Sequence, residues 1–172
     1  EKKIIAITGA TGAQGGSLAR AILQDTKSEF TVRAITRNPN SDKAKNLADM
    51  GARVVQADLD DKSSLVKAFE GAYGAFCITN FWEHFSPEKE TIQASNLAKA
   101  AHEATVKHVI WSSLDDTRKL VPLSDNRMPT LMGKYKVPHF DAKGEAEKFF
   151  LESGLPTTIL HTVFYWENFI YF

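Results

Sequence analysis

Short apolar runs alternate along the chain with segments in which apolar residues recur three and four positions apart. The first pattern is typical of buried strands and the second of helices that cover a sheet. Strands are predicted at 3–8, 31–36, 53–57, 73–78, 106–112 and 156–162, with helices at about 13–23, 42–50, 64–70, 87–104 and 140–152. This alternation predicts right-handed βαβ units, and therefore a doubly wound parallel sheet of the Rossmann type with helices on both faces.

One long segment, 114–138, breaks the alternation. It shows no periodicity and contains Pro122, Pro129, Gly133 and Pro138. A loop of this length inside a compact domain is usually functional. Because it leads directly into the last predicted helix, we expect either a substrate lid or a switching element that gains order when a ligand binds.

A glycine-rich turn, Gly9-Ala-Thr-Gly-Ala-Gln-Gly-Gly16, lies between the first strand and the first helix. Such a turn lets a pyrophosphate approach the backbone, and the helix N-terminus favours its negative charge. The spacing is G-x-x-G-x-x-G, and a purely structural turn is the alternative. The position of this turn between the first strand and the first helix of a six-strand pattern favours a bound dinucleotide. The expected contact residues are Gly9, Ala10, Thr11, Gly12, Ala13, Gln14 and Gly15.

The end of the second strand carries Arg37 where folds specific for NAD place an acid. A guanidinium can bind a 2′-phosphate through two hydrogen bonds, so NADP(H) is expected to be preferred over NAD(H). An ordinary solvated arginine is the alternative. After the third strand, Asp58 and Leu59 are placed to close the adenine pocket, although Asp58 is equally suited to cap its own turn.

These motifs together resemble the NmrA-like family, an atypical branch of the short-chain dehydrogenases/reductases. The matching runs are Thr8–Gly16, Thr36–Pro39, Ala57–Asp61, Thr79–Asn80, His139–Glu145 and Tyr165–Asn168. The resemblance implies one NAD(P)-binding Rossmann domain over 1–172. Family members are usually about twice as long, so we expect the C-terminal substrate lobe to be largely absent and the chain to be truncated after its sixth strand.

The resemblance also places residues at the nicotinamide end of the cofactor. Thr79 and Asn80, which end the fourth strand, are expected to line the nicotinamide ribose. The resemblance extends this contact to Phe81 and adds a group that follows the sixth strand. That group is Tyr165, Trp166, Glu167 and Asn168. Packing against a further lobe is the alternative role for it.

The Tyr-x-x-x-Lys pair of the classical superfamily is missing, and His139-x-x-x-Lys143 stands where it would be expected. Four-residue spacing puts both side chains on one helix face. Lys143 is expected to bind the nicotinamide ribose, and His139 to relay a proton near neutral pH. The alternatives are a solvated lysine and a histidine that forms hydrogen bonds in a hinge after Pro138. Ser112 and Ser113 end the fifth strand, where the superfamily serine lies. One hydroxyl is expected to reach the cleft; the alternative is that both form hydrogen bonds with the backbone at the strand end.

Charge and composition narrow the range of partners. The chain has 172 residues, with 21 Lys and Arg against 21 Asp and Glu, and this balance argues against nucleic acid or an anionic membrane as the main partner. Its single cysteine, Cys77, lies within an apolar strand and is expected in the core, and a reducing compartment is expected, the cytoplasm with the nucleus as a second site. No metal-ligand spacing is found among the histidines.

Two functions compete at this stage. The missing tyrosine, together with a likeness to NADPH-sensing members of the family, favours a redox-sensing regulator that reports NADP(H) to a protein partner. The alternative is an NADPH-dependent reductase of quinones or related carbonyl or imine substrates. A homodimer is compatible with both hypotheses.

Overall fold

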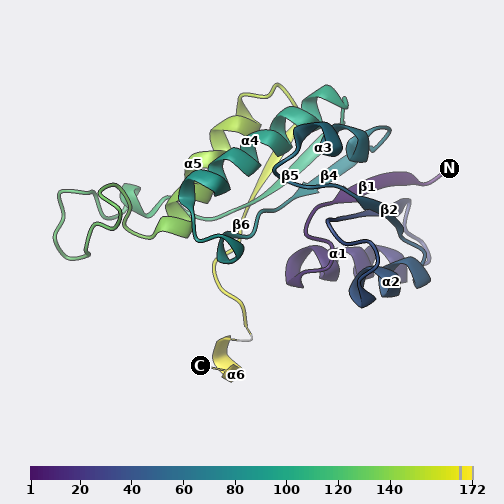
Figure 1. The fold of residues 1–172 in the computed structure, drawn as a ribbon, viewed down its shortest axis with the longest axis horizontal. Helices are drawn as coiled ribbons and strands as arrows, with labels where there is room; N and C mark the ends of the chain where they lie inside the picture. Colours follow the sequence, from purple (N-terminus) through teal and green to yellow (C-terminus); the bar gives the residue numbers. More distant parts are fainter. Residues whose placement is uncertain (167, 172) are drawn as a thin grey trace.

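The computed structural model describes residues 1–166 and 168–171, which fold around one parallel sheet (Figure 1). The strands are β1 (Lys3–Ile7), β2 (Phe30–Thr36), β3 (Arg53–Gln56), β4 (Gly74–Cys77), β5 (His108–Ser113) and β6 (Thr157–His161). Their order in the sheet is β3-β2-β1-β4-β5-β6. The predicted doubly wound Rossmann-type sheet is therefore confirmed, and its strand order reverses between β1 and β4.

Helices connect the strands and carry the capping residues expected from the sequence. They are α1 (Ala13–Gln24), α2 (Asp42–Asp49), α3 (Lys62–Phe69), α4 (Pro87–Glu103), α5 (Pro138–Leu151) and α6 (Asn168–Tyr171), with short 3₁₀ turns η1 (Phe81–Glu83) and η2 (Thr117–Lys119). The hydroxyl of Ser41 accepts a hydrogen bond at the start of α2, and that of Ser86 does so at the start of α4. Helix α5 begins at Pro138, earlier than predicted, so His139 lies inside the helix and not in a hinge.

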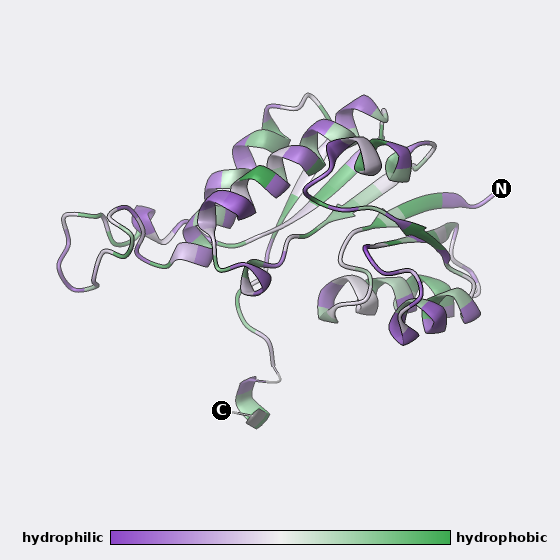
Figure 2. Ribbon diagram, in the orientation of Figure 1, coloured by the Kyte–Doolittle hydropathy of each residue, from purple (hydrophilic) through white to green (hydrophobic). Residues whose placement is uncertain are grey.

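The helices form two layers. Figure 1 shows α3, α4 and α5 over one face of the sheet, and α1 and α2 on the other face beside β1, β2 and β3. In Figure 2 the strands are mainly green, whereas the helices also carry purple, polar stretches. Trp111 is fully buried and stacks on Phe150 with ring centroids 4.6 Å apart. Cys77 is also fully buried, as expected, and burial raises the pKa of its thiol far above the ordinary value. No helix in the described ranges is long and apolar enough to cross a membrane.

The segment between β5 and α5 forms an arm that projects away from the sheet (Figure 1). Both ends of this arm are fastened to the fully buried carboxylate of Asp141 in α5. Its Oδ1 accepts from the backbone N–H of Thr117 at 2.8 Å, and its Oδ2 accepts from the N–H of Lys136 at 2.7 Å. Lys136 Nζ donates to the carbonyl oxygens of Asp125 and Met128, each at 2.7 Å. The arm is therefore held by polar contacts that hydrophobic periodicity does not reveal.

Candidate functional site

The strand order reverses between β1 and β4, and a cavity lies at the carboxyl ends of these strands. Thr8 joins the two strand ends, because its Oγ accepts from the N–H of Ile78 at 2.9 Å and donates to the Ile78 carbonyl at 3.1 Å. The cavity has a volume of about 290 Å³. In doubly wound sheets, the switch point is the position at which ligands bind.

The glycine turn forms one wall of this cavity, and Gly9 and Gly15 are required by its geometry. Gly9 has a φ of +58°, in the left-handed region that favours glycine. A Cβ at Gly15 would lie 2.5 Å from the carbonyl oxygen of Gly9, so only glycine lets the turn pack this closely on α1. Gly12 occupies the N-cap of α1 and has no side chain to cap it, which leaves the first N–H groups of the helix free to bind an anion.

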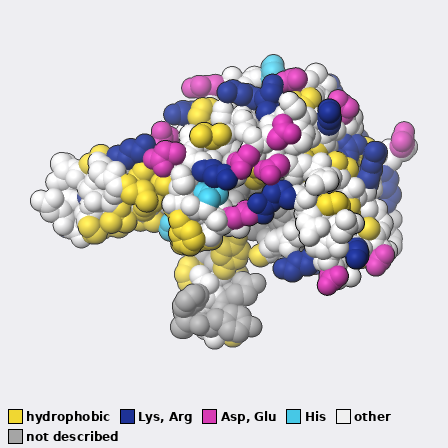
Figure 3. All heavy atoms as spheres, in the orientation of Figure 1, with side chains coloured by type: hydrophobic (Ala, Val, Ile, Leu, Met, Phe, Trp, Pro, Cys, Tyr) yellow, Lys and Arg dark blue, Asp and Glu magenta, His cyan; other side chains and the backbone are white. Residues whose placement is uncertain are grey.

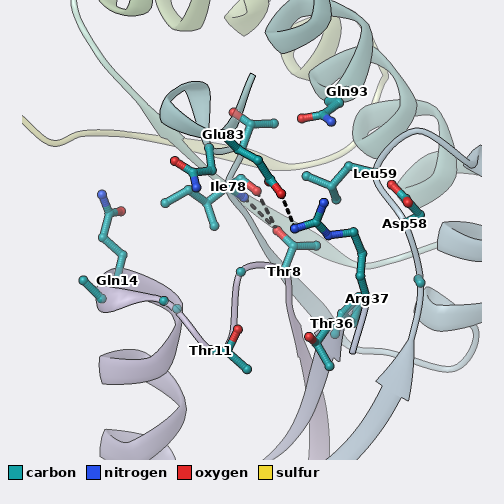
Figure 4. Close-up of a pocket in the computed structure, with 18 of the residues that line it drawn as sticks. Thr8, Thr11, Gln14, Thr36, Arg37, Asp58, Leu59, Ile78, Glu83 and Gln93 are labelled. Atoms are coloured by element: carbon teal, nitrogen blue, oxygen red, sulfur yellow. Dashed lines mark hydrogen bonds and ion pairs between the residues drawn. The ribbon is translucent and has the colours of Figure 1, made fainter. Parts of the chain in front are cut away.

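Arg37 lies on the opposite side of the cavity, at the end of β2 (Figure 4). Its guanidinium forms an ion pair with Glu83 of η1, and both side chains are partly exposed. Asp58 and Leu59 line the same cavity. The carboxylate of Asp58 also accepts from the N–H of Asp60 at 2.9 Å, so both roles weighed for Asp58 are compatible with its position.

A second, larger cavity of about 740 Å³ adjoins the first. The two cavities share Gln14, Ile78, Thr79, Asn80 and Tyr165 in their linings. Gln14 lies at this boundary, since its Nε2 donates to the Tyr165 hydroxyl at 3.1 Å and its Oε1 accepts from Ser112 Oγ at 2.7 Å. The remaining walls are mainly apolar and aromatic, and they comprise Phe81, Trp82, Leu114, His139, Phe140, Lys143, Thr162, Val163, Phe164 and Asn168.

Exposed hydrophobic side chains are also numerous around the second cavity. Figure 3 shows hydrophobic side chains near the C-terminal segment, and a separate group over the arm. Trp82 is 58% exposed and Phe164 is 57% exposed. The cavity is therefore an apolar cleft that is open to large aromatic groups.

Lys143 lies almost buried in the floor of the second cavity, where its ammonium meets several acceptors. Its Nζ lies 3.0 Å from Thr79 Oγ, 3.2 Å from the Thr79 carbonyl and 3.4 Å from the Ser112 carbonyl. Glu90 Oε1 is 3.3 Å away and also accepts from the Thr79 hydroxyl at 2.6 Å. Burial lowers the pKa of Lys143, and the carboxylate of Glu90 opposes that shift. Lys143 thus ties together the ends of β4 and β5.

Glu90 is fully buried in the first turns of α4 and was not found by sequence reasoning. Its second carboxylate oxygen lies 3.3 Å from Nε2 of His84. A carboxylate among buried surroundings needs a cationic partner, and Lys143 provides one. The only clue in the sequence was that Glu90 lies on the same helix face as residues such as Ala94 and Leu97, which are expected to be buried.

His139 lies one turn before Lys143 and faces the same cavity, as the four-residue spacing predicted. Its ring packs beside Trp82, with centroids 4.7 Å apart, and beside Phe140 at 4.9 Å. Burial lowers the pKa of His139, with nearby carboxylates only partly opposing the shift. The imidazole is therefore mainly neutral at pH 7, the form that can accept a proton.

The structure brings most of the predicted contact residues together at these two cavities. Those lining one or both are Gly9, Thr11, Gly12, Ala13, Gln14, Gly15, Arg37, Asp58, Leu59, Thr79, Asn80, Phe81, His139, Lys143, Tyr165 and Asn168. Ala10 differs, because its side chain is fully buried in the core. Trp166 is 78% exposed and lines neither cavity, and Glu167 lies outside the described residues.

Other expectations need correction. The hydroxyls of Ser112 and Ser113 are buried and line neither cavity. Of the long segment between β5 and α5, only Leu114 reaches a cavity, so the arm is not placed as a lid. Its apolar residues lie on a projection fastened at both ends. In the described ranges, no group of three His, Cys, Asp or Glu side chains is arranged to hold a metal ion.

The sequence pattern of the NmrA-like family matches residues 1–172. The chain belongs to the NmrA-like family. It is 36% identical over 171 residues to the NmrA-like family domain-containing oxidoreductase FrzB of Cladobotryum sp, covering 97% of this chain and 48% of that protein. It is 35% identical to the corresponding oxidoreductase notA′ of Aspergillus versicolor, over 89% of this chain and 41% of the relative. The chain thus spans about half the length of these curated relatives.

The solved structures to which this chain is similar include both enzymes and a regulator. Triphenylmethane reductase of Citrobacter sp., complexed with NADP(H), superposes with a TM-score of 0.77 at 28% identity, over 96% of this chain and 51% of that one. The NADPH-dependent quinone oxidoreductase QOR2 of Escherichia coli, complexed with NADPH, gives 0.72 at 30% identity, over 97% and 51%. NmrA, a negative transcriptional regulator solved with NADP, gives 0.74 at 29% identity, over 93% and 45%. NmrA has also been solved with NAD. Each of these three neighbours has therefore been solved with a nicotinamide dinucleotide bound.

Proposed function

We propose that this chain is the NADP(H)-binding domain of a reductase that acts on planar aromatic or conjugated substrates. The observation that carries the proposal is the direct junction of the two cavities at Gln14 and Tyr165. A polar groove that suits a dinucleotide thereby leads into an apolar cleft that suits an aromatic substrate. Two structurally similar proteins, triphenylmethane reductase and the quinone oxidoreductase QOR2, are named for aromatic or conjugated substrates, which supports this substrate class.

The residues of the first cavity suit NADP(H). The pyrophosphate would lie against the N-terminus of α1 and the turn containing Gly12, and the 2′-phosphate would meet Arg37. The adenine would lie beside Asp58 and Leu59. This arrangement directs the nicotinamide toward Thr79, at the border of the second cavity.

Bound NADPH supplies a hydride, and the chain's own side chains orient the acceptor and manage the accompanying proton. Lys143 provides a fixed positive charge at the cofactor's nicotinamide end, held by Thr79 and Glu90. His139 is open to the cleft and mainly neutral, so it would first take up a proton from solvent; the imidazolium would then donate that proton to the reduced carbonyl or quinone oxygen and return to the neutral form. The aromatic walls can hold a planar ring by stacking.

The test is to titrate NADPH and NADH against wild type and Arg37→Ala, and then to follow NADPH oxidation with a panel of quinones and triphenylmethane dyes. Loss of a charge-assisted contact to phosphate should weaken NADPH binding by about 1.5–3 kcal/mol, roughly one to two decades in Kd, and should leave NADH nearly unchanged. Arg127→Ala is the matched control, because Arg127 is an exposed arginine that pairs only with Asp125 among the residues described. Failure of both nucleotides to bind would contradict the proposal.

A regulator that senses NADP(H) is the second candidate. It is favoured by the missing Tyr-x-x-x-Lys pair and by the engagement of the Lys143 ammonium with protein acceptors. The likeness to NmrA, a negative transcriptional regulator, supports it as well. Tight NADPH binding without turnover of any substrate in the panel would favour the regulator.

A further inference from the structure

We propose that Glu83 is a specificity-determining residue of the cofactor groove, which weakens NADP(H) binding by competing with the 2′-phosphate for Arg37. The inference rests on the proposed NADP(H) function and concerns a residue for which sequence reasoning gave no role. Glu83 lines the first cavity, and its carboxylate pairs with the guanidinium of Arg37.

The position of this ion pair follows from the topology of the sheet. Arg37 follows β2, whereas Glu83 belongs to η1, which follows β4. Strand β1 lies between β2 and β4, so the ion pair passes over the carboxyl end of β1, where the glycine turn begins. Figure 4 shows Arg37 and Glu83 reaching toward each other on the cavity side of Thr8. A dinucleotide that extends from the β2 end to the β4 end must cross this line and displace the pair.

Glu83 is positioned beside the first cavity by the short 3₁₀ turn η1, whose backbone is held by a hydrogen bond and a buried side chain. The N–H of Glu83 donates to the carbonyl of Asn80 at 3.2 Å, and Phe81, which begins η1, is only 7% exposed. The backbone therefore keeps the carboxylate within reach of Arg37. The side chain of Glu83 is itself 43% exposed and can turn into solvent without disturbing that anchor.

The two cofactors differ in what they offer Arg37 once Glu83 has been displaced. The 2′-phosphate of NADPH replaces the carboxylate as an anionic partner, whereas the 2′-hydroxyl of NADH provides no charge. A displaced carboxylate also repels a nearby phosphate but not a hydroxyl. Glu83 therefore opposes binding of both nucleotides and opposes NADPH more strongly, which narrows the preference that Arg37 creates.

The experiment measures Kd for NADPH and NADH with wild type and Glu83→Gln. Exposed ion pairs are worth little, so neutralising Glu83 should tighten NADPH by roughly two- to five-fold, and NADH by a smaller factor. The gain should shrink as salt is added, because the groups are solvent-accessible. Glu88→Gln is the matched control: Glu88 lies nearby in the first turn of α4, pairs loosely with Lys134 at 3.8 Å, and its loss changes the net charge equally.

A double-mutant cycle isolates the competition. Replacing Arg37 by Ala should cost NADPH affinity more in the Glu83→Gln background than in wild type, by the same two- to five-fold factor, because the phosphate then has no rival for the guanidinium. An unchanged Kd in Glu83→Gln, or an equal change in Glu88→Gln, overturns the inference while leaving the proposed function intact. A wild type that binds neither nucleotide refutes both.

Discussion

Neutralising the buried carboxylate of Glu90 should strongly destabilise the protein. Glu90 has no exposed surface, and it lies 3.3 Å from the ammonium of Lys143, which is itself only 8% exposed. In Glu90→Gln the amide keeps an acceptor for the Thr79 hydroxyl, but Lys143 is left as an uncompensated buried charge. Breaking a buried pair in this way costs about 3–5 kcal/mol. Because Gln has nearly the same shape as Glu, we expect a loss at the lower end of this range, about 3 kcal/mol in the free energy of unfolding. For a chain of this size, that loss corresponds to a fall in Tm of roughly 6–12 °C.

The assay is urea unfolding at pH 7, with Glu103→Gln as the control. Glu103 pairs with Lys62 at 2.6 Å, which is closer than the Glu90 pair, but both side chains of the control pair are about half exposed. Surface pairs contribute up to about 1 kcal/mol, so burial and not distance should decide the difference. Adding Lys143→Met to Glu90→Gln should restore part of the lost stability, because it removes the stranded charge.

The effect should also depend on pH. Burial lowers the pKa of Lys143 in the folded protein, and loss of Glu90 lowers it further, while the unfolded chain titrates near the ordinary value. The unfolded state then binds more protons, so the stability of Glu90→Gln rises with pH through that window. Its deficit relative to wild type should narrow from pH 7 toward pH 10. A loss no larger than that of Glu103→Gln, or a double variant no more stable than the single one, would refute this reasoning.

Three further predictions concern the site and its surroundings. Gly12→Val should fold but lose NADPH binding in a titration, since its Cβ would lie on the cavity wall, 3.2 Å from the Gly9 carbonyl oxygen. In Gly15→Val the Cβ would lie only 2.5 Å from that oxygen, so this variant should also lose thermal stability. Because the pKa of His139 is lowered in the folded protein, the free energy of unfolding should fall as pH drops below about 6.5. His139→Phe should reduce this fall, measured by urea unfolding at pH 7 and pH 5. An equal loss of stability between the two pH values in wild type and variant would contradict the prediction. Hydrogen exchange across 115–137 should be unchanged by saturating NADPH, because this arm lines neither cavity. Added protection there would instead support the switching element expected from the sequence.

The doubly wound parallel sheet could be predicted because each strand is an apolar run bounded by turn residues and each connection is long enough for a helix. The glycine turn and Arg37 were found for a related reason, since each directly follows a strand and strand ends meet at one edge of the sheet. The start of α5 was predicted two residues too late, although Pro138 occupies a first helical position that favours proline.

The rest depended on contacts between residues that are distant in the sequence. Glu83 and Glu90 look like ordinary polar residues until the fold brings them to Arg37 and Lys143. The arm was interpreted as a lid or a switching element because its hydrophobic pattern is aperiodic, yet the buried carboxylate of Asp141 organises it through hydrogen bonds from backbone N–H groups. Polar contacts of this kind have no period, so a single sequence does not reveal them.

The narrow pairing between β1 and β4 has a mechanical consequence. The two strands share three residue pairs, from Ile5 with Gly74 to Ile7 with Phe76, whereas β1 and β2 share five. Beyond the ladder, Thr8 adds one clasp at the open edge. The sheet thus consists of two halves, β3-β2-β1 and β4-β5-β6, that meet where β1 pairs with β4, and α3 and α4 pack against each other over one face. A dinucleotide bound across the β1–β4 pairing would contact both halves of the sheet. A force that separates the two halves would therefore have to displace the ligand before the strands could come apart.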